Sequence, residues 1–279
     1  MIKIQDFSFT YKDETKPALQ EIRLSVPEGG FLGVIGPAGA GKTTLARAIT
    51  GMVPHHYPGD FYGSVIVNGM DTVDSSILDL SRIVGMVFQD VDSQIISPLV
   101  EDEILYGLEN FGILREEIPV RMEEALQKVG IADLRERTVT SLSGGQRQKV
   151  AIASILALKP QVLVMDEPTG ELDPRSSRQI FNLLKELNEV QGITVVVIEQ
   201  KIMLLCEFAK QLAVLSEGRI VRQGDTRDVL AYAEELQALG VNCPRVTTLS
   251  RILSQKLSEE QPVCVNLDEA EAMVRRLIS

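Results

Sequence analysis

One stretch of sequence decides the fold: Gly36-Pro37-Ala38-Gly39-Ala40-Gly41-Lys42-Thr43-Thr44. It matches the G-x-x-x-x-G-K-[ST] phosphate-loop pattern at every fixed position. The apolar run before it, residues 31–35, predicts a buried strand, and residues 45–49 after it predict a helix. A phosphate loop joins a strand to a helix, so the neighbouring sequence agrees with the motif.

The residues of this loop suit the binding of a nucleoside triphosphate. Glycine carries no Cβ, so the backbone can curl closely around a phosphate chain. The exposed N–H groups and the positive end of the following helix then face anionic oxygens. Lys42 can reach the β- and γ-phosphates, and the Thr43 hydroxyl can ligate Mg²⁺. The alternative, a plain glycine-rich turn, requires neither Lys42 nor Thr43.

Composition limits the kind of protein that carries this loop. The 279 residues, 44% of them hydrophobic, suit one large α/β domain, or one such domain with a small appendage. No run approaches about 18 apolar residues, and the N-terminal residues lack an apolar secretory region. The net charge of −11 argues against a nucleic-acid partner. The three cysteines have no metal-ligand spacing and are expected to be buried thiols in a reducing cytoplasm.

Two adjacent carboxylates follow a fully apolar strand. Residues 162–165 predict a buried strand that delivers Asp166 and Glu167 at its C-terminal end, where α/β sheets place ligands. Two acids at such a place are costly unless a cation or a reaction uses them. Asp166 suits a magnesium ligand acting through water, and Glu167 suits a residue that orients attacking water or accepts its proton.

A second glycine-rich segment runs from Leu142 to Gln146 and opens a long helix. Ser143 and Gln146 have the spacing of a capping box, which accounts for the helix start. It does not account for Gly144 and Gly145, because glycine lowers helix stability and bares backbone N–H groups. We therefore interpret this helix start as a second phosphate-binding surface.

Two further residues have open interpretations. Tyr11 could stack on a purine, or it could cap the core at the end of a strand, and spacing does not separate the two. Gln89 ends an apolar strand, where its carbonyl could ligate Mg²⁺ or water, or where it could be a surface glutamine. The Pro- and Gly-rich segment 52–63 holds both histidines and is interpreted as a loop without a metal.

The end of the chain departs from the alternation of strands and helices. Asp173 and Pro174 predict a helix start, with Asp as the N-cap. From about Ala231 only short helical pieces follow, separated by Pro244 and Pro262. We therefore expect a nucleotide-binding domain at 1–230 and a small helical domain at 231–279 that lies on the cassette or on a second subunit.

The chain resembles the ATP-binding cassette (ABC) ATPases in the order of its motifs: the phosphate loop, Gln89, the segment 142–146, the strand with its two acids, and Asp173. The likeness covers about residues 1–230, and the Ser143–Gln146 signature is specific to that family. It implies an α/β phosphate-loop NTPase of ABC type with a helical subdomain, an antiparallel β subdomain and a small helical C-terminal appendage.

The resemblance also implies roles for single residues, with ATP and Mg²⁺ as cofactors. ATP-binding roles fall to Tyr11, which would stack on adenine, to residues 36–44 and to Gln89. The Mg²⁺ ligands would be Thr43, Gln89 and Asp166, and the catalytic residues Glu167 and Gln200. Ser143, Gly144, Gly145 and Gln146 would bind the ATP of a partner chain in a head-to-tail dimer. Asp173 would lie in the loop that couples the two sites.

Two stretches, 88–110 and the tail beyond Ala231, resemble the energy-coupling factor importers of vitamins and transition-metal ions. That likeness implies an ATPase subunit on the cytoplasmic face of the cell membrane, attached peripherally. Its partners would be a second ABC ATPase, in a homodimer or, as we favour, a heterodimer, together with a transmembrane coupling subunit and a substrate-binding membrane subunit. The tail would serve for dimerisation.

The sequence departs from the family pattern at two places. Gln200 stands where the family usually has a histidine that contacts the γ-phosphate, and Glu171 stands where glycine is common before Leu172. The first departure favours a second hypothesis, a cassette that binds ATP as a structural or regulatory half while its partner hydrolyses. Glu167 argues for hydrolysis by this chain.

Overall fold

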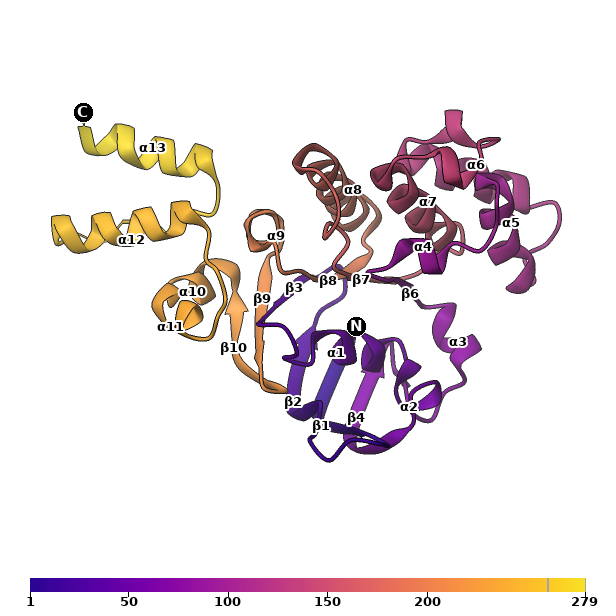
Figure 1. Cartoon of the computed structure of the whole chain (residues 1–279), viewed down its shortest axis with the longest axis horizontal. Helices are drawn as coiled ribbons and strands as arrows, with labels where there is room; N and C mark the ends of the chain where they lie inside the picture. Colours follow the sequence, from indigo (N-terminus) through magenta and orange to yellow (C-terminus); the bar gives the residue numbers. More distant parts are fainter. Residues whose placement is uncertain (260, 279) are drawn as a thin grey trace.

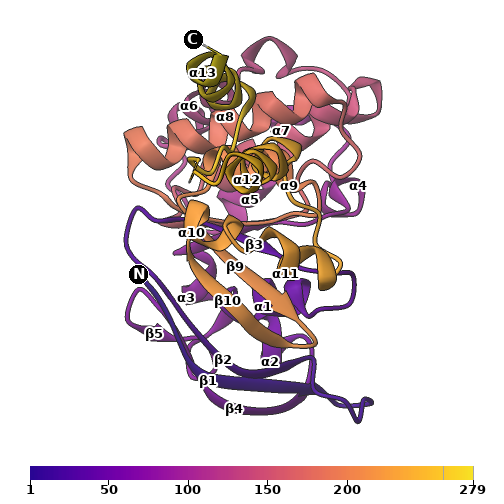
Figure 2. The same ribbon diagram turned by 90° about the vertical axis from the view of Figure 1, so that its left-hand side faces the viewer.

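The computed structural model describes residues 1–259 and 261–278. Two sheets lie one above the other, with helices beyond the larger sheet (Figures 1 and 2). The larger sheet has the order β10-β9-β3-β8-β7-β6 and the smaller the order β2-β1-β4-β5. The strands of the larger sheet are β3 (Phe31–Ile35), β6 (Val84–Val87), β7 (Val162–Asp166), β8 (Thr194–Ile198), β9 (Gln211–Ser216) and β10 (Arg219–Asp225).

The larger sheet is parallel except at one edge. Strands β9, β3, β8, β7 and β6 are parallel neighbours, whereas β10 is antiparallel to β9. Every residue of β3, β6, β7 and β8 is buried. A parallel strand covered on both faces requires continuous apolar sequence, which explains why these runs do not alternate. The predicted strands around the phosphate loop and before the two acids are therefore confirmed.

The smaller sheet is antiparallel and consists of β1 (Ile2–Tyr11), β2 (Leu19–Val26), β4 (Gly59–Val67) and β5 (Met70–Asp71). Along β2, buried residues alternate with more exposed ones, as expected for a sheet with one face on the core. The prediction of a loop over residues 52–63 is wrong at both ends. Helix α2 (Met52–His55) occupies its start, and β4 begins at Gly59 because it pairs with β1 as far as Tyr11.

Two layers of helix cover the larger sheet. Helix α1 (Lys42–Ile49) lies between the two sheets, where its apolar residues share one core with both. The opposite face carries α7 (Gly144–Leu156), α8 (Pro174–Gln191) and α9 (Ile202–Phe208), with Phe181 fully buried there. A helical group made of α4 (Val91–Gln94), α5 (Val100–Asn110), α6 (Ile118–Val129) and α7 projects to one side (Figure 1). Short helices α3 (Ile77–Ser81), η1 (Ala132–Leu134) and η2 (Val139–Ser141) complete the connections.

The tail contains α10 (Thr226–Leu230), α11 (Ala233–Ala238), α12 (Arg245–Leu257) and α13 (Leu267–Ile278). Leu236 and Val241 belong to the core of the cassette. Helices α12 and α13 instead share a separate small core, whose buried members are Val246, Cys264, Ala270 and Met273. The boundary at residue 230 stays a prediction, and positions 260 and 279 of the predicted tail domain lie outside the described residues.

Helices α12 and α13 and the segment between them form a helical hairpin, and Arg227 ties this hairpin to α10. Its guanidinium donates to both carboxylate oxygens of Glu269, at 3.0 and 2.8 Å, and to the carbonyl of Val263.

Across the described residues, 1–259 and 261–278, there is no helix with the length and apolar character needed to cross a bilayer.

Candidate functional site

The phosphate loop has a backbone that only glycine can follow. Gly36, Gly39 and Gly41 have φ values of 156°, 74° and 100°. A Cβ on Gly36 would lie 2.0 Å from the carbonyl oxygen of Leu215, and one on Gly41 would lie 2.4 Å from that of Ala18. The loop is thus fixed between backbone walls with its curvature already formed.

Lys42 is held inside this loop. Its side chain is 6% exposed, and its Nζ donates to the carbonyls of Gly36 and Pro37 at 3.0 and 2.9 Å. Burial lowers the pKa of Lys42, and the nearby charges of Glu167 and Asp166 oppose that shift. A partly desolvated ammonium held at the loop can exchange carbonyl contacts for phosphate oxygens, which are the stronger acceptors.

Asp166 lies at the C-terminal end of β7, is 3% exposed, and hydrogen-bonds the Thr43 side chain. Within the described part of the chain its Oδ1 has no hydrogen-bond partner. Burial raises the pKa of Asp166, against the effect of the Thr43 hydrogen bond. A buried carboxylate oxygen without a donor, beside a threonine hydroxyl, offers the hard oxygen ligands that Mg²⁺ prefers. Asp166 and Thr43 therefore fit a magnesium ion.

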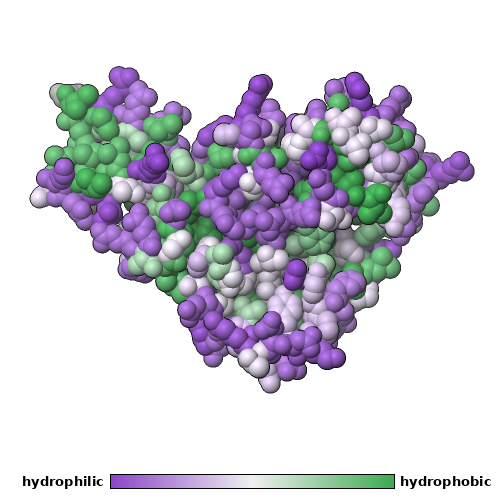
Figure 3. Space-filling model, in the orientation of Figure 1, coloured by the Kyte–Doolittle hydropathy of each residue, from purple (hydrophilic) through white to green (hydrophobic). Residues whose placement is uncertain are grey.

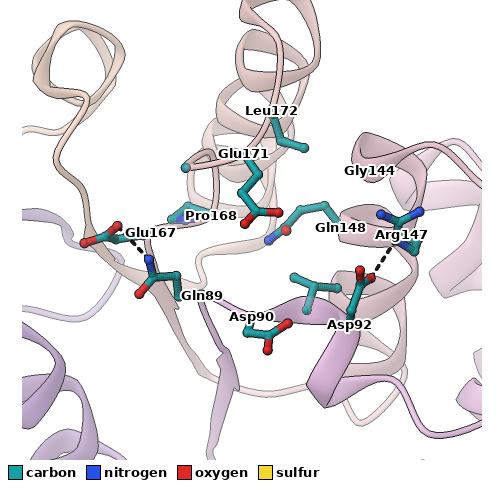
Figure 4. A pocket seen from close by; sticks show the side chains of 12 residues that line it. Gln89, Asp90, Asp92, Gly144, Arg147, Gln148, Glu167, Pro168, Glu171 and Leu172 are labelled. Atoms are coloured by element: carbon teal, nitrogen blue, oxygen red, sulfur yellow. Dashed lines mark hydrogen bonds and ion pairs between the residues drawn. The ribbon is translucent and has the colours of Figure 1, made fainter.

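Glu167 is held by two glutamine amides. Gln89 Nε2 donates to its Oε2 at 3.1 Å (Figure 4), and Gln200 Nε2 donates to its Oε1 at 2.6 Å. The backbone of Glu167 has φ 48°, a left-handed conformation that is uncommon for glutamate, and its N–H donates to Ile198. Strained backbone of this kind concentrates at functional sites. The structure thus brings Glu167, Gln89 and Gln200 together.

The signature segment begins α7 with the predicted capping box. Ser143 Oγ accepts from the Gln146 N–H at 3.3 Å, and Gln146 Oε1 accepts from the Ser143 N–H at 2.9 Å. Gly145 also allows close packing, because a Cβ on it would lie 3.0 Å from Ser176 Oγ. A Cβ on Gly144 would lie 3.6 Å from Leu172 Cδ2, an ordinary van der Waals distance. Gly145 therefore has a packing role within this chain that the sequence did not indicate.

A pocket joins the signature helix to the carboxylate. It is lined by Gln89, Glu167, Glu171, Gly144 and Gln148, among others (Figure 4). Of the residues that the structure describes, none from the phosphate loop lines it. Gly144 of the signature and Glu167 thus line opposite ends of one pocket of this chain (Figure 4).

Asp173 is the N-cap of α8, as predicted. Its Oδ1 accepts from the N–H groups of Arg175 and Ser176 at 2.9 and 3.1 Å, and its Oδ2 accepts from the Ser176 hydroxyl at 2.5 Å. The hydrogen bond from the Ser176 side chain is the main cause of a lowered pKa of Asp173. Asp173 therefore fixes the end of the loop that begins at Glu167.

Tyr11 is tied to the helix after the phosphate loop. Its hydroxyl lies 3.1 Å from Thr44 Oγ1 and accepts from Arg47 at 3.1 Å. Its ring meets Phe9 edge-on, with centroids 4.9 Å apart. The structure thus gives Tyr11 a packing role at the end of β1, and stacking on a base stays a prediction.

Sequence reasoning gave no role to Glu199, the residue after β8. It is 1% exposed, and its carboxylate accepts from the backbone of Thr169, Gln200 and Lys201 and from the Thr169 hydroxyl. Burial raises the pKa of Glu199, against the effect of these donors. The signal in the sequence was an acid directly after six apolar or β-branched residues, the same pattern that identified Asp166 and Glu167.

Comparison with known proteins identifies the family. The family model described as "ABC transporter" matches residues 19–170. A protein of Pyrococcus horikoshii named as an ABC transporter ATP-binding protein is 39% identical over 98% of this chain and 96% of its own length. This chain belongs to the ABC transporter ATP-binding family. The prediction of an ABC-type ATPase with this fold is confirmed at the level of the family.

Other relatives of this ABC ATPase differ in length and in how closely they are named. An energy-coupling factor transporter ATP-binding protein of Caldanaerobacter subterraneus is 38% identical over 92% of each chain. A Methanosarcina acetivorans relative is 41% identical over 95% of this chain, which spans only 42% of that protein. The chain therefore corresponds to nearly the whole of some relatives and to less than half of others.

Solved structures agree with this assignment. CbiO1 from Clostridium perfringens, described as part of the ABC transporter complex CbiONQ, superposes with a TM-score of 0.76 at 31% identity. That superposition covers 90% of this chain and 98% of CbiO1. The dimeric structure of the ABC cassette MJ0796 gives a TM-score of 0.70 at 30% identity, over 81% of this chain and 99% of that one.

Proposed function

We propose that this ABC ATPase binds Mg-ATP at residues 36–44 and hydrolyses it with Glu167 as the catalytic carboxylate. The observation that carries the proposal is the position of Glu167. It follows a buried magnesium-type aspartate, lies close enough to Lys42 for their charges to interact, and is held by two amide donors. A carboxylate positioned in this way can orient attacking water and accept its proton.

The other side chains divide the remaining tasks. Lys42 neutralises charge on the β- and γ-phosphates, while Thr43 and Asp166 would hold Mg²⁺, with the Gln89 carbonyl as a further ligand. When bound, the ion stabilises the charge that develops on the transferred phosphoryl group. The Gln200 amide keeps the Glu167 carboxylate oriented and offers a donor to the γ-phosphate. Tyr11 stacks on the adenine.

We infer a head-to-tail dimer in which Ser143–Gln146 closes over the ATP of the partner chain. Two observations support it. Within this chain Gly144 of the signature lines a pocket to which no described residue of the phosphate loop contributes, and the start of its helix bares N–H groups as anion sites do. The MJ0796 cassette is dimeric, and a second structure of it holds ADP and phosphate after hydrolysis. Asp173 then lies in the loop that couples the two sites.

We propose further that the transporter is an importer of the energy-coupling factor type, taking up a vitamin or a transition-metal ion. The named Caldanaerobacter relative and the CbiO1 structure support this. The chain would then lie peripherally on the cytoplasmic face of the membrane. Its partners would be a transmembrane coupling subunit, a substrate-binding membrane subunit and a second ABC ATPase that differs from it.

The tail, residues 231–279, is the proposed dimerisation domain. Leu249, Ile252 and Leu257 of α12 are 38%, 39% and 48% exposed, and Leu267 and Ile278 of α13 are 76% and 80% exposed. Figure 3 shows hydrophobic surface over this end of the molecule. Apolar side chains gathered on one exposed element favour a protein interface over solvent.

A second candidate function is a regulatory half-site. Gln200 cannot become cationic as histidine can, so this chain could hold ATP while a partner cassette does most of the hydrolysis. The close Gln200–Glu167 hydrogen bond favours this alternative if it restrains the carboxylate. The presence of Glu167 itself favours hydrolysis by this chain.

ATP turnover by the purified full-length chain tests the proposal. Wild type should bind and hydrolyse Mg-ATP, and Glu167→Gln should keep ATP binding while lowering turnover by about 10²-fold or more. Glu171→Gln is the matched control, because Glu171 lies in the same pocket but has no proposed part in the reaction. Equal turnover of Glu167→Gln and wild type would contradict the assignment, and full binding with no wild-type turnover would favour the regulatory half-site.

A further inference from the structure

Three consecutive residues after β8 all contact the loop that runs from Glu167 to Asp173. Gln200 donates to the Glu167 carboxylate, as described above. Glu199 and Lys201 both bind Thr169, in the middle of the same loop. The loop follows β7 and the three residues follow β8. Because β7 and β8 are parallel, hydrogen-bonded neighbours, both segments leave the sheet at the same edge.

Glu199 fixes the loop at Thr169. Its Oε1 accepts from the Thr169 N–H at 3.0 Å and from the Thr169 hydroxyl. Its Oε2 accepts from the N–H groups of Gln200 and Lys201 at 3.0 and 3.2 Å. Every donor in this set is a neutral group bonded to a charged acceptor, and such hydrogen bonds are stronger than those between two neutral groups. A fully buried carboxylate is tolerated here because donors surround it.

Lys201 binds two backbone carbonyls of the same loop. Its Nζ donates to the carbonyl of Thr169 at 2.8 Å and to that of Leu172 at 3.4 Å. The Leu172 N–H donates to the same Thr169 carbonyl at 3.2 Å, so one ammonium joins both ends of the turn 169–172. The side chain is otherwise exposed, and a lysine needed only for solubility would not be directed back onto two backbone carbonyls.

The held loop connects two functional elements. At its start lies Glu167, and at its end Leu172 lies against Gly144 of the signature helix, before the Asp173 cap. A shift of Thr169 or Leu172 would move both the carboxylate and the surface that faces the signature. A displacement of about 1 Å at a reacting group can lower a rate about 10²-fold.

We propose that Glu199 and Lys201 are positioning residues for ATP hydrolysis, which hold the loop 167–172 so that Glu167 and the signature helix keep their relative places. They touch neither nucleotide nor water in this role. The inference rests on the proposed function, because it assigns Glu167 to the reaction.

The test compares Lys201→Met, Lys201→Arg and wild type in the full-length chain. Methionine keeps most of the apolar stem and loses both hydrogen bonds, whereas arginine keeps donors for the two carbonyls. Lys201→Met should lower the single-turnover rate constant at saturating Mg-ATP by about tenfold or more, with the ATP Kd changed less than about threefold. Lys201→Arg should recover most of the rate. Lys210→Met, at an exposed lysine after α9, is the matched control and should behave as wild type.

Hydrogen exchange of the segment 167–173 tests the holding step without turnover. The Thr169 amide should exchange at least about tenfold faster in Glu199→Gln and in Lys201→Met than in wild type, because each variant removes contacts that keep the loop closed. Unchanged exchange in both variants would overturn the proposal. So would a wild-type rate constant in Lys201→Met, or a loss of rate that ATP binding explains in full. A wild-type chain that exchanges as expected but never hydrolyses ATP would refute the proposed function and leave the holding role supported.

Discussion

Gln200 offers the sharpest test of how this chain treats its own ATP. Its Nε2 lies 2.6 Å from Glu167 Oε1, short for an amide donor and a carboxylate. Replacing it with alanine leaves Gln89, at 3.1 Å, as the remaining amide on that carboxylate. Replacing it with histidine restores a donor that can carry a positive charge.

The magnitude follows from the exposure of the pair. A hydrogen bond to a charged group contributes about 1.5–3 kcal/mol, and Gln200 is exposed, so the lower end applies. If the transition state loses about 1.5 kcal/mol of stabilisation because this hydrogen bond no longer orients Glu167, the rate falls about tenfold. We therefore expect Gln200→Ala to hydrolyse about tenfold more slowly than wild type. Losing one well-placed donor to developing charge lowers a rate by about 10²–10³. Glutamine supplies part of what a histidine donor would give at this position. Gln200→His should therefore hydrolyse ATP faster than wild type.

The assay is single-turnover hydrolysis in a complex whose other site is disabled by mutation. ATP affinity is measured in parallel and should not change in either variant, and Gln237→Ala, at an exposed glutamine of α11, serves as the control. Equal rates for wild type and Gln200→Ala would show that the close contact with Glu167 has no catalytic part. Equal rates for wild type and Gln200→His would mean that the position is neutral, and Gln200 would then give no reason to expect an unlike partner.

Four further predictions concern other parts of the molecule. Lys42→Ala should abolish tight ATP binding, and a variant with ordinary affinity in an equilibrium titration would contradict the phosphate-loop assignment. Gly144→Asp should leave ATP binding by the isolated chain nearly intact but block turnover, since the new carboxylate faces both Leu172 and any partner phosphate; loss of binding would place the signature at the Lys42 site. The pKa of Asp173 is lowered from an ordinary 3.8 in the folded state, so its stabilising effect is present above that value and is lost as pH falls through the folded pKa. Below pH 4 the melting temperature of Asp173→Asn should thus fall less than that of wild type. Parallel decreases in the two proteins would argue against the cap. A chain ending at residue 243 keeps α11 and should still bind ATP, while its ATP-independent subunit pairing, followed by sedimentation, weakens by at least about tenfold; undiminished pairing would show that α12 and α13 only cover the cassette.

Sequence predicted the parts of the site that depend on short motifs. The phosphate loop, the acids after β7 and the Asp173 cap each lie within one strand-to-helix connection, so a local pattern contains all their geometry. The four-residue signature was predicted as a capping box for the same reason, and its two hydrogen bonds are present.

The rest depends on contacts between distant segments. Glu199 and Thr169 are 30 residues apart, and nothing near Glu199 in the sequence indicates which loop it will hold. The packing of Gly145 against Ser176 likewise follows from how α7 meets α8. The loop predicted over residues 52–63 extends too far because Pro58 and Gly59 are typical of loops, whereas pairing with β1 makes β4 begin at Gly59.

The hairpin of α12 and α13 bears on how such a tail could pass between proteins. Among the described residues, the small core that the two helices share has four buried hydrophobic members, which is far less than a chain of under about 40 residues needs to fold unaided. Arg227, outside the hairpin, binds Glu269 and Val263 within it, so part of what orders the hairpin belongs to the cassette. A gene fusion that moved residues 244–278 alone would therefore transfer the hairpin without the Arg227 contacts that help to order it. In evolution the exchangeable unit would have to begin no later than α10.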